Sequence, residues 1–136
     1  MPIGAEITLL SLEEYTKYKD IIPLIKDPWW WLKDSDIEAL VHGVCDDGSL
    51  CGSICNFNSG VRPALKIHLS NSKNLKSGDK IRLGSKDFTV LSWEESELFA
   101  LCDEFIAIRK FDSCTNEWKS SELKQWLETE GVKLIF

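Results

Sequence analysis

Five cysteines and two histidines are the residues of this chain that could bind a metal ion or act as nucleophiles. Cys45, Cys51 and Cys55 lie close together in the sequence, and His42 or His68 would have to complete a ligand set. Zinc sites usually combine one closely spaced Cys pair with a second pair of Cys or His. Here the spacing is irregular and the second pair is missing. We therefore interpret these cysteines as small apolar side chains in strands, and we expect no metal ion and no cofactor.

Other patterns typical of catalysis are also missing from the sequence. Neither histidine occurs in a signature with a nucleophile or an acid, so both are interpreted as ordinary half-buried or surface residues. The chain has no glycine-rich phosphate loop, dinucleotide fingerprint or HExxH motif. Carboxylates that could bind calcium occur without an EF-hand pattern, and turn chemistry explains them; they are Asp34, Asp36, Asp46 and Asp47. We expect no catalytic residues.

The candidates for ligand binding are aromatic and polar residues in the first half of the chain. Tryptophans can stack on sugar rings or anchor a protein interface. On a strand, Trp29 and Trp31 share one face and Trp30 takes the other, so at least one is expected in the core. The segment 56–60 (NFNSG) suits adaptable polar contacts. Arg62 could bind a carboxylate, although a role in holding a loop is favoured. The predicted ligand-binding residues are Trp29, Trp30, Trp31, Lys33, Asn56, Asn58 and Arg62.

Local patterns predict the elements that must position these residues. Ser11 and Glu14 form a capping box for a short helix, which Pro23 and Pro28 limit. Ser120 and Ser121 can cap a second helix that Gly131 ends. Pro63 indicates an edge or a bulge. Strands are expected at 7–10, 29–32, 37–45, 49–55, 61–69, 80–83, 87–93, 97–102, 105–110 and 132–136, with a hairpin turn at 46–48.

These elements predict an α+β fold, mainly antiparallel β with two short helices. A chain of 136 residues fits one domain and can bury a core without crosslinks. The linker-like segment 70–78 separates two halves, 1–69 and 79–136, each too thin for a core of its own. We expect one domain in which the two halves depend on each other.

Charge and composition limit the classes of partner. The chain has 16 Lys and Arg against 22 Asp and Glu, so its net charge is −6. That balance argues against nucleic acids and anionic membranes as partners. The N-terminus does not resemble a signal peptide, and the apolar stretches are too short to span a bilayer. An odd number of cysteines favours reduced thiols and a cytoplasmic location.

Several segments resemble a bacterial domain family of unknown function. Its motifs, a WWLRSPG-like run and a GVRPAL sequence, are similar to Trp29–Lys33 and Gly60–Leu65. The segment Leu9–Tyr15 resembles the stretch that precedes the family's tryptophans. In the second half, Ser77–Gly84 looks like the family's opening strand and Trp118–Leu127 like its helix. After the tryptophans this chain has Lys-Asp-Ser-Asp where the family has Arg-Ser-Pro-Gly.

The matching segments occur in reversed order across the linker. The family usually places the segment like Trp118–Leu127 first and GVRPAL last, which implies a circular permutation or a cut through tandem copies. A permutation predicts that Met1 and Phe136 lie close in space. The family is similar to the C-type-lectin-like folds of formylglycine-generating proteins and phage receptors. That resemblance implies a C-type-lectin-like fold and a function in recognition.

Three functional hypotheses follow. The favoured one is a non-catalytic module that binds a carbohydrate or a protein, through the loops 33–36 and 53–62 beside the tryptophans. The second is an assembly subunit that forms homo-oligomers, because rearranged segments often complete each other between chains. An enzyme that uses Cys51 or Cys55 with a metal ion is the least favoured.

Overall fold

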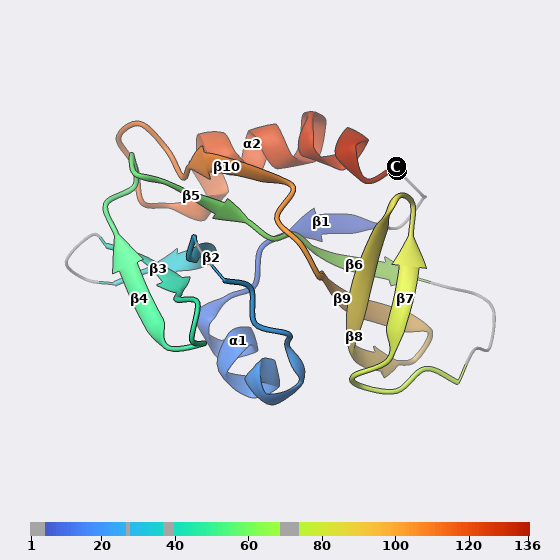
Figure 1. The fold of residues 1–136 in the computed structure, drawn as a ribbon. Helices are drawn as coiled ribbons and strands as arrows, with labels where there is room; N and C mark the ends of the chain where they lie inside the picture. Colours follow the sequence, from blue (N-terminus) through green and yellow to red (C-terminus); the bar gives the residue numbers. More distant parts are fainter. Residues whose placement is uncertain (1–4, 27, 37–39, 69–73) are drawn as a thin grey trace.

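The computed structural model describes residues 5–26, 28–36, 40–68 and 74–136, which form two β-sheets and two α-helices (Figure 1). Sheet A is antiparallel throughout and has the order β1 (Glu6–Thr8), β6 (Ala64–His68), β9 (Glu97–Cys102), β8 (Lys86–Glu94), β7 (Lys80–Leu83). Sheet B has the order β10 (Ala107–Lys110), β5 (Asn58–Val61), β2 (Trp30–Ser35), β3 (Val41–Val44), β4 (Leu50–Ser53). Among the described strands, only β2 and β5 run parallel. The α+β, mainly antiparallel fold predicted from the sequence is confirmed at this level.

Both halves of the chain contribute strands to both sheets. In sheet A, β6 from the first half pairs with β9 from the second. In sheet B, β5 pairs with β10 in the same way. The segment 70–78, predicted as a linker, lies partly outside the described residues, and its end forms a turn at Ser77 and Gly78 that leads into β7. Cross-pairing of this kind makes each sheet depend on both halves.

The strand predicted over 61–69 is wrong in one respect, because it is two strands in two different sheets. The chain leaves sheet B at Arg62 and Pro63 and enters sheet A at Ala64. Proline cannot donate to a strand ladder, so the ladder is interrupted where the chain changes sheets. Leu65 and Ile67 do share a buried face, as the alternation predicts, and Leu69 lies outside the described residues.

Both helices begin where the sequence predicts. In α1 (Leu12–Tyr18), Ser11 Oγ accepts a hydrogen bond from the Glu14 N–H at 3.0 Å, and Glu14 Oε1 accepts one from the Ser11 N–H at 2.8 Å. A short 3₁₀ turn, η1 (Lys19–Ile21), follows α1, and another, η2 (Trp118–Ser120), precedes the second helix. Ser121 caps α2 (Glu122–Thr129) by accepting from the Lys124 N–H at 3.0 Å. None of the helices among the described residues is long and apolar enough to cross a membrane.

The last predicted strand, 132–136, is wrong: Gly131–Leu134 form a 3₁₀ helix, η3. Leu134 and Phe136 are exposed, while Gly131 and Ile135 are buried. Burial four residues apart is the spacing of a helix. The Ile135 carbonyl accepts from the Ser85 N–H at 2.7 Å, which holds this end of the chain against the β7–β8 turn.

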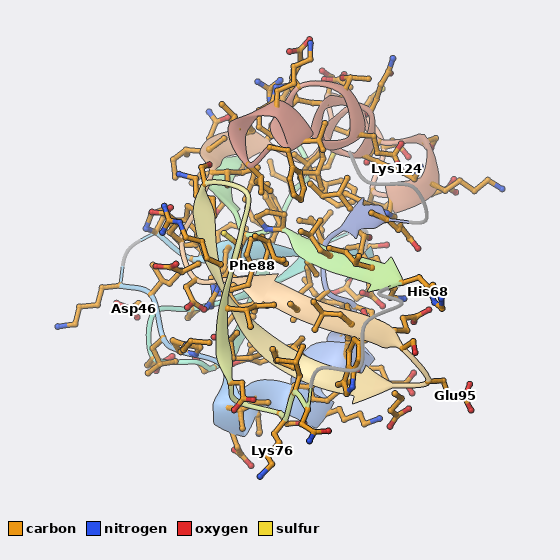
Figure 2. All side chains as sticks on the ribbon, turned by 90° about the vertical axis from the view of Figure 1, so that its right-hand side faces the viewer. Asp46, His68, Lys76, Phe88, Glu95 and Lys124 are labelled. Carbon is orange, nitrogen blue, oxygen red and sulfur yellow. The ribbon has the colours of Figure 1, made fainter. Side chains whose placement is uncertain are left out.

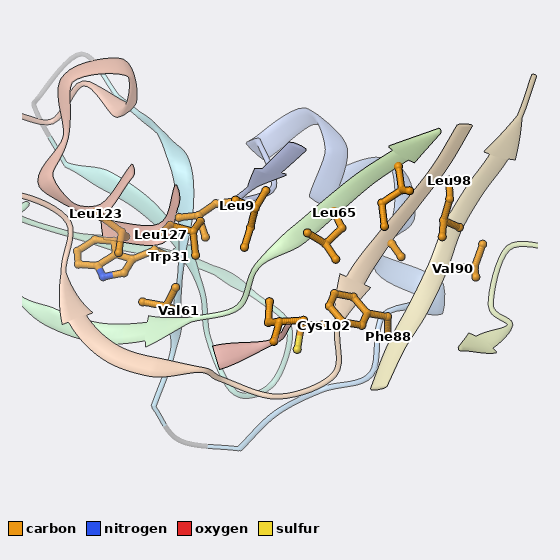
Figure 3. Close-up of a cluster of buried hydrophobic side chains, with 14 of the residues drawn as sticks. Leu9, Trp31, Val61, Leu65, Phe88, Val90, Leu98, Cys102, Leu123 and Leu127 are labelled. Carbon is orange, nitrogen blue, oxygen red and sulfur yellow. The ribbon is translucent and has the colours of Figure 1, made fainter. Parts of the chain in front are cut away.

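Two clusters of buried side chains hold the layers together. The larger one runs beneath α2 and across sheet A, from Trp31 and Leu123 to Phe88 and Val90 (Figure 3). The smaller one joins α1 to the opposite faces of both sheets and contains Trp30. Neighbouring tryptophans on β2 therefore enter different clusters, as the alternation of a strand predicts.

Candidate functional site

Trp29, which immediately precedes β2, anchors the candidate site. Its indole stacks on the ring of Phe57, with centroids 6.3 Å apart and planes inclined by 21°. Its other neighbour is Trp31, which it meets edge to face at 4.6 Å. The Trp29 carbonyl accepts hydrogen bonds from the Ser59 hydroxyl and, at 3.0 Å, from the Gly60 N–H. These bonds fix β5 to the segment that leads into β2.

Phe57 is an exposed aromatic residue between two asparagines in the sequence. Phe57 is 52% exposed, although large aromatic rings are usually buried. Phe57 lies at the end of a turn between β4 and β5, in which its N–H donates to the Ile54 carbonyl at 3.2 Å. Asn56 and Asn58 on either side are also exposed. We call Trp29, Asn56, Phe57 and Asn58 the Phe57 platform.

A shallow hollow of about 360 Å³ is lined by Asn58 and by Ile108, Arg109 and Lys110 of β10. Antiparallel pairing of β5 with β10 places Lys110 opposite Asn58. The guanidinium of Arg109 lies 4.5 Å from the centre of the Trp126 ring, so α2 positions it. The Lys110 ammonium is 3.5 Å from Glu122. The hollow thus offers an exposed apolar side chain, Ile108, beside two cations.

Of the predicted binding residues, Trp29 contacts Phe57, and Asn56 and Asn58 are the exposed residues on either side of Phe57 in the sequence. The others lie elsewhere. Trp30 and Trp31 are 1% and 0% exposed, within the two core clusters. The Trp31 Nε1–H donates to the Arg109 carbonyl at 2.9 Å. Lys33 lies further along β2, half-buried, and its N–H donates to the Leu10 carbonyl.

Arg62 is completely buried where the chain crosses between the sheets. Its Nε donates to the Cys102 carbonyl at 2.6 Å and its Nη1 to the Pro23 carbonyl at 2.9 Å. The guanidinium also lies over the Trp30 ring at 5.0 Å. Desolvation lowers the pKa of Arg62 to about 10, against the opposing attraction of Asp103. The side chain therefore stays charged at neutral pH and ties three separate segments together.

The cysteines and histidines do not gather into one site. His42 lies on β3 and His68 at the end of β6, in different sheets. All five cysteines are free. Cys51 lies opposite Gly43 in the β3–β4 hairpin. Burial, and then a hydrogen bond with the Cys45 thiol, raise the pKa of Cys51 to about 12. Among the described residues, no three His, Cys, Asp or Glu side chains are grouped so that they could hold a metal ion.

The four candidate acids lie in turns and at an element end. Asp34 accepts from the Leu12 N–H at the start of α1, and Asp36 from the Leu40 N–H. Hydrogen bonds from the Ser49 side chain and N–H lower the pKa of Asp47 in the predicted β3–β4 turn, where Gly48 has a φ of +87°. Figure 2 shows Asp46 and His68 on opposite sides of the molecule.

A second hollow, of about 390 Å³, lies between α1 and sheet A, far from the Phe57 platform in sequence. Its aromatic groups are Tyr18 and Phe99, which meet edge to face at 6.1 Å. The chain's own lysines cover them: Lys17 lies 5.2 Å from the Tyr18 ring and Lys66 5.2 Å from the Phe99 ring. A ligand would first have to displace these cations, so we favour the Phe57 platform.

Phe57 lay within the predicted loop but was not singled out, and Ile108, Arg109 and Lys110 were not predicted at all. For Phe57 the sequence offers a usable signal, because a phenylalanine between two asparagines indicates an aromatic ring in a polar loop. For the β10 residues no local signal exists, because only the pairing of β5 with β10 brings them to Asn58. Comparisons with family models, with curated proteins and with solved structures returned no match to this chain.

Proposed function

We propose that this chain is a non-catalytic recognition module that binds carbohydrate at the Phe57 platform. The observation that carries the proposal is an exposed aromatic ring, backed by Trp29, between two exposed amides. An aromatic face gives the C–H groups of a sugar ring a flat apolar partner, and burying that area is favourable. Asparagine amides both donate and accept, which suits hydroxyl groups.

The adjoining hollow extends the platform for a ligand longer than one sugar. The Lys110 Nζ donates to the Ser113 Oγ at 2.6 Å and lies 3.5 Å from Glu122, which leaves it one further donor, and Ile108 is 52% exposed. A second sugar could place hydroxyl or carboxylate groups near the Lys110 ammonium, which carries three donors. Acidic oligosaccharides should therefore bind more tightly than neutral ones, and this preference should weaken as salt is added.

The C-type-lectin-like fold and the permuted segment order belong to the same proposal. Support comes from the antiparallel α+β architecture and from the ends of the described chain. Both Figure 1 and Figure 2 place the start of β1 beside the C-terminal segment. Ala5 also packs against the core cluster that contains Ile135. Met1, on which the predicted closeness of the termini depends, lies outside the described residues.

The free state of all five cysteines supports a reducing, cytoplasmic location. The net charge of −6 supports the view that nucleic acids and anionic membranes are not partners.

A glycan-binding screen with intrinsic tryptophan fluorescence tests the proposal. Because Trp29 stacks on Phe57, a sugar that covers the platform should change the emission in a saturable way. Phe57→Ala and Asn58→Ala should weaken binding at least about tenfold. Phe136→Ala is the matched control, since Phe136 is also an exposed phenylalanine (43%) but belongs to the C-terminal segment. Binding that survives Phe57→Ala, or the absence of any glycan ligand in the screen, would overturn the proposal.

A further inference from the structure

The β4 strand, Leu50–Ser53, is an unpaired edge of sheet B. Its only partner among the described strands is β3. An edge strand exposes backbone N–H and C=O groups that can pair with another strand. Proteins usually guard such edges with charged side chains, prolines or bulges, so an unguarded edge indicates a surface for strand pairing.

The register identifies the backbone groups that point away from β3. The Cys45 N–H donates to the Ser49 carbonyl at 2.8 Å, which makes this a hydrogen-bonded position of the hairpin. Such positions alternate along an antiparallel pair. Cys51, opposite Gly43, and Ser53, opposite Val41, therefore direct their backbone groups toward β3. Leu50 and Gly52 direct theirs outward.

The side chains leave this edge open. Leu50 is 51% exposed and Ile54 56% exposed. No residue from Leu50 to Asn58 is charged or a proline, in a chain whose net charge is −6. The three other edge strands of the two sheets all carry charged residues: Lys80 and Arg82 on β7, Arg109 and Lys110 on β10, and Glu6 on β1. β4 can therefore pair with β4 of a second copy without placing like charges of the two strands opposite each other.

We infer that β4 pairs antiparallel with β4 of a second copy of this chain, about a two-fold axis at Cys51. In this register Leu50 of one copy lies opposite Gly52 of the other. Each pair exchanges two backbone hydrogen bonds, which gives about four in all. The outward groups of β4 are thus self-complementary, as an isologous interface requires.

The residues at the axis fit this register. Cys51 would face its own copy at a non-hydrogen-bonded position, where the side chains come closest, and it is small and uncharged. Antiparallel pairing also puts the two acidic turns, each with Asp46 and Asp47, at opposite ends of the joined strands. The two sheets B would become one continuous sheet. This inference does not rest on the proposed sugar binding.

Sedimentation and amide hydrogen exchange of the full chain test the inference. The mass should rise from monomer to dimer over about a hundredfold range of concentration. Over the same range the Leu50 and Gly52 amides should become protected from exchange, while the Cys51 amide, bonded to β3, should be protected throughout. A monomer mass at every concentration, or a dimer in which both amides stay unprotected, would overturn it.

Leu50→Pro gives a sharper comparison, because it removes an outward donor without breaking the β3–β4 ladder. It should weaken dimerisation at least about tenfold, whereas Leu50→Val, which keeps the N–H, should leave it within about twofold. If Leu50→Pro does not fold, Leu50→Glu replaces it, with Leu134→Glu as the control for the same change at another exposed leucine. Equal dimerisation of Leu50→Glu and Leu134→Glu would count against β4.

Discussion

The indole of Trp29 lies directly on the backbone of Gly43: a Cβ atom at residue 43 would fall 2.4 Å from Cε3 of the Trp29 ring. The same Cβ would lie 2.9 Å from the Trp30 carbonyl oxygen. Glycine thus leaves the space in which Trp29 rests, and Phe57 stacks on the tryptophan. The Trp29–Phe57 stack therefore depends on the absence of a side chain at Gly43 of β3.

Gly43→Ala should therefore disturb the platform from beneath. The added methyl group displaces the Trp29 ring or strains β3, at a cost of about 1–3 kcal/mol in the free energy of unfolding. Glycan binding should fall together with the tryptophan emission that reports on Trp29. Urea unfolding and a binding titration measure both effects. Unchanged stability and affinity would show that the Trp29 ring does not rest on Gly43.

Replacing Arg62 should destabilise the fold rather than weaken binding directly. Arg62→Ala leaves the carbonyls of Cys102 and Pro23 without their donors and creates a cavity beside Trp30, so the free energy of unfolding should fall by about 3 kcal/mol or more. Arg62→Lys should recover only part of this, because an ammonium cannot reproduce the two-pronged geometry. Chemical denaturation of both variants measures the loss. If the variants stay stable but lose glycan binding, Arg62 belongs to the ligand site instead.

Asp112 should make the free energy of unfolding depend on pH in the acidic range. The carboxylate accepts hydrogen bonds from the N–H groups of Cys114 and Thr115 at 2.9 Å and of Glu122 at 2.7 Å. Burial raises its pKa, but these bonds outweigh burial and hold the pKa below its ordinary value. Its stabilising effect is therefore complete above the unfolded pKa of about 3.9 and is lost as the pH falls through the folded value.

Asp112→Asn should thus cost about 1–3 kcal/mol at pH 7 and much less at pH 2. Urea titrations of both proteins at a series of pH values give this difference. If the difference in the free energy of unfolding between wild type and variant stays constant down to pH 2, Asp112 does not act as an ionised acceptor at the start of α2.

The β8–β9 turn offers a stabilising change. Glu95 and Ser96 have φ values of 51° and 66°, and they are the non-glycine residues with positive φ in the described chain. Two left-handed residues make a type I′ turn, for which glycine is the better second residue. Ser96→Gly should raise the free energy of unfolding by about 1 kcal/mol. Ser120→Gly, at a residue without positive φ, is the control and should give no gain.

Much of the local structure was predictable because its signals are short-range. Ser11 with Glu14, Ser121 before Glu122, and Asp46-Asp47-Gly48 each form a motif whose hydrogen bonds join residues a few positions apart. Alternation along a strand likewise sent Trp30 and Trp31 into different core clusters. The antiparallel α+β character follows from such motifs, since each fixes an element and its buried face.

The tertiary structure alone decided which elements meet. Pairing of β5 with β10 brings Lys110 to Asn58, and the fold of the loop before β5 brings Phe57 onto Trp29. The split at Arg62 and the helical form of 131–134 also depend on distant partners, namely the Cys102 carbonyl and the Ser85 N–H. The sequence by itself determined the elements and their apolar faces, because these depend on neighbouring residues. The candidate site could be located only in the fold, because the contacts that form it join segments that no local pattern connects.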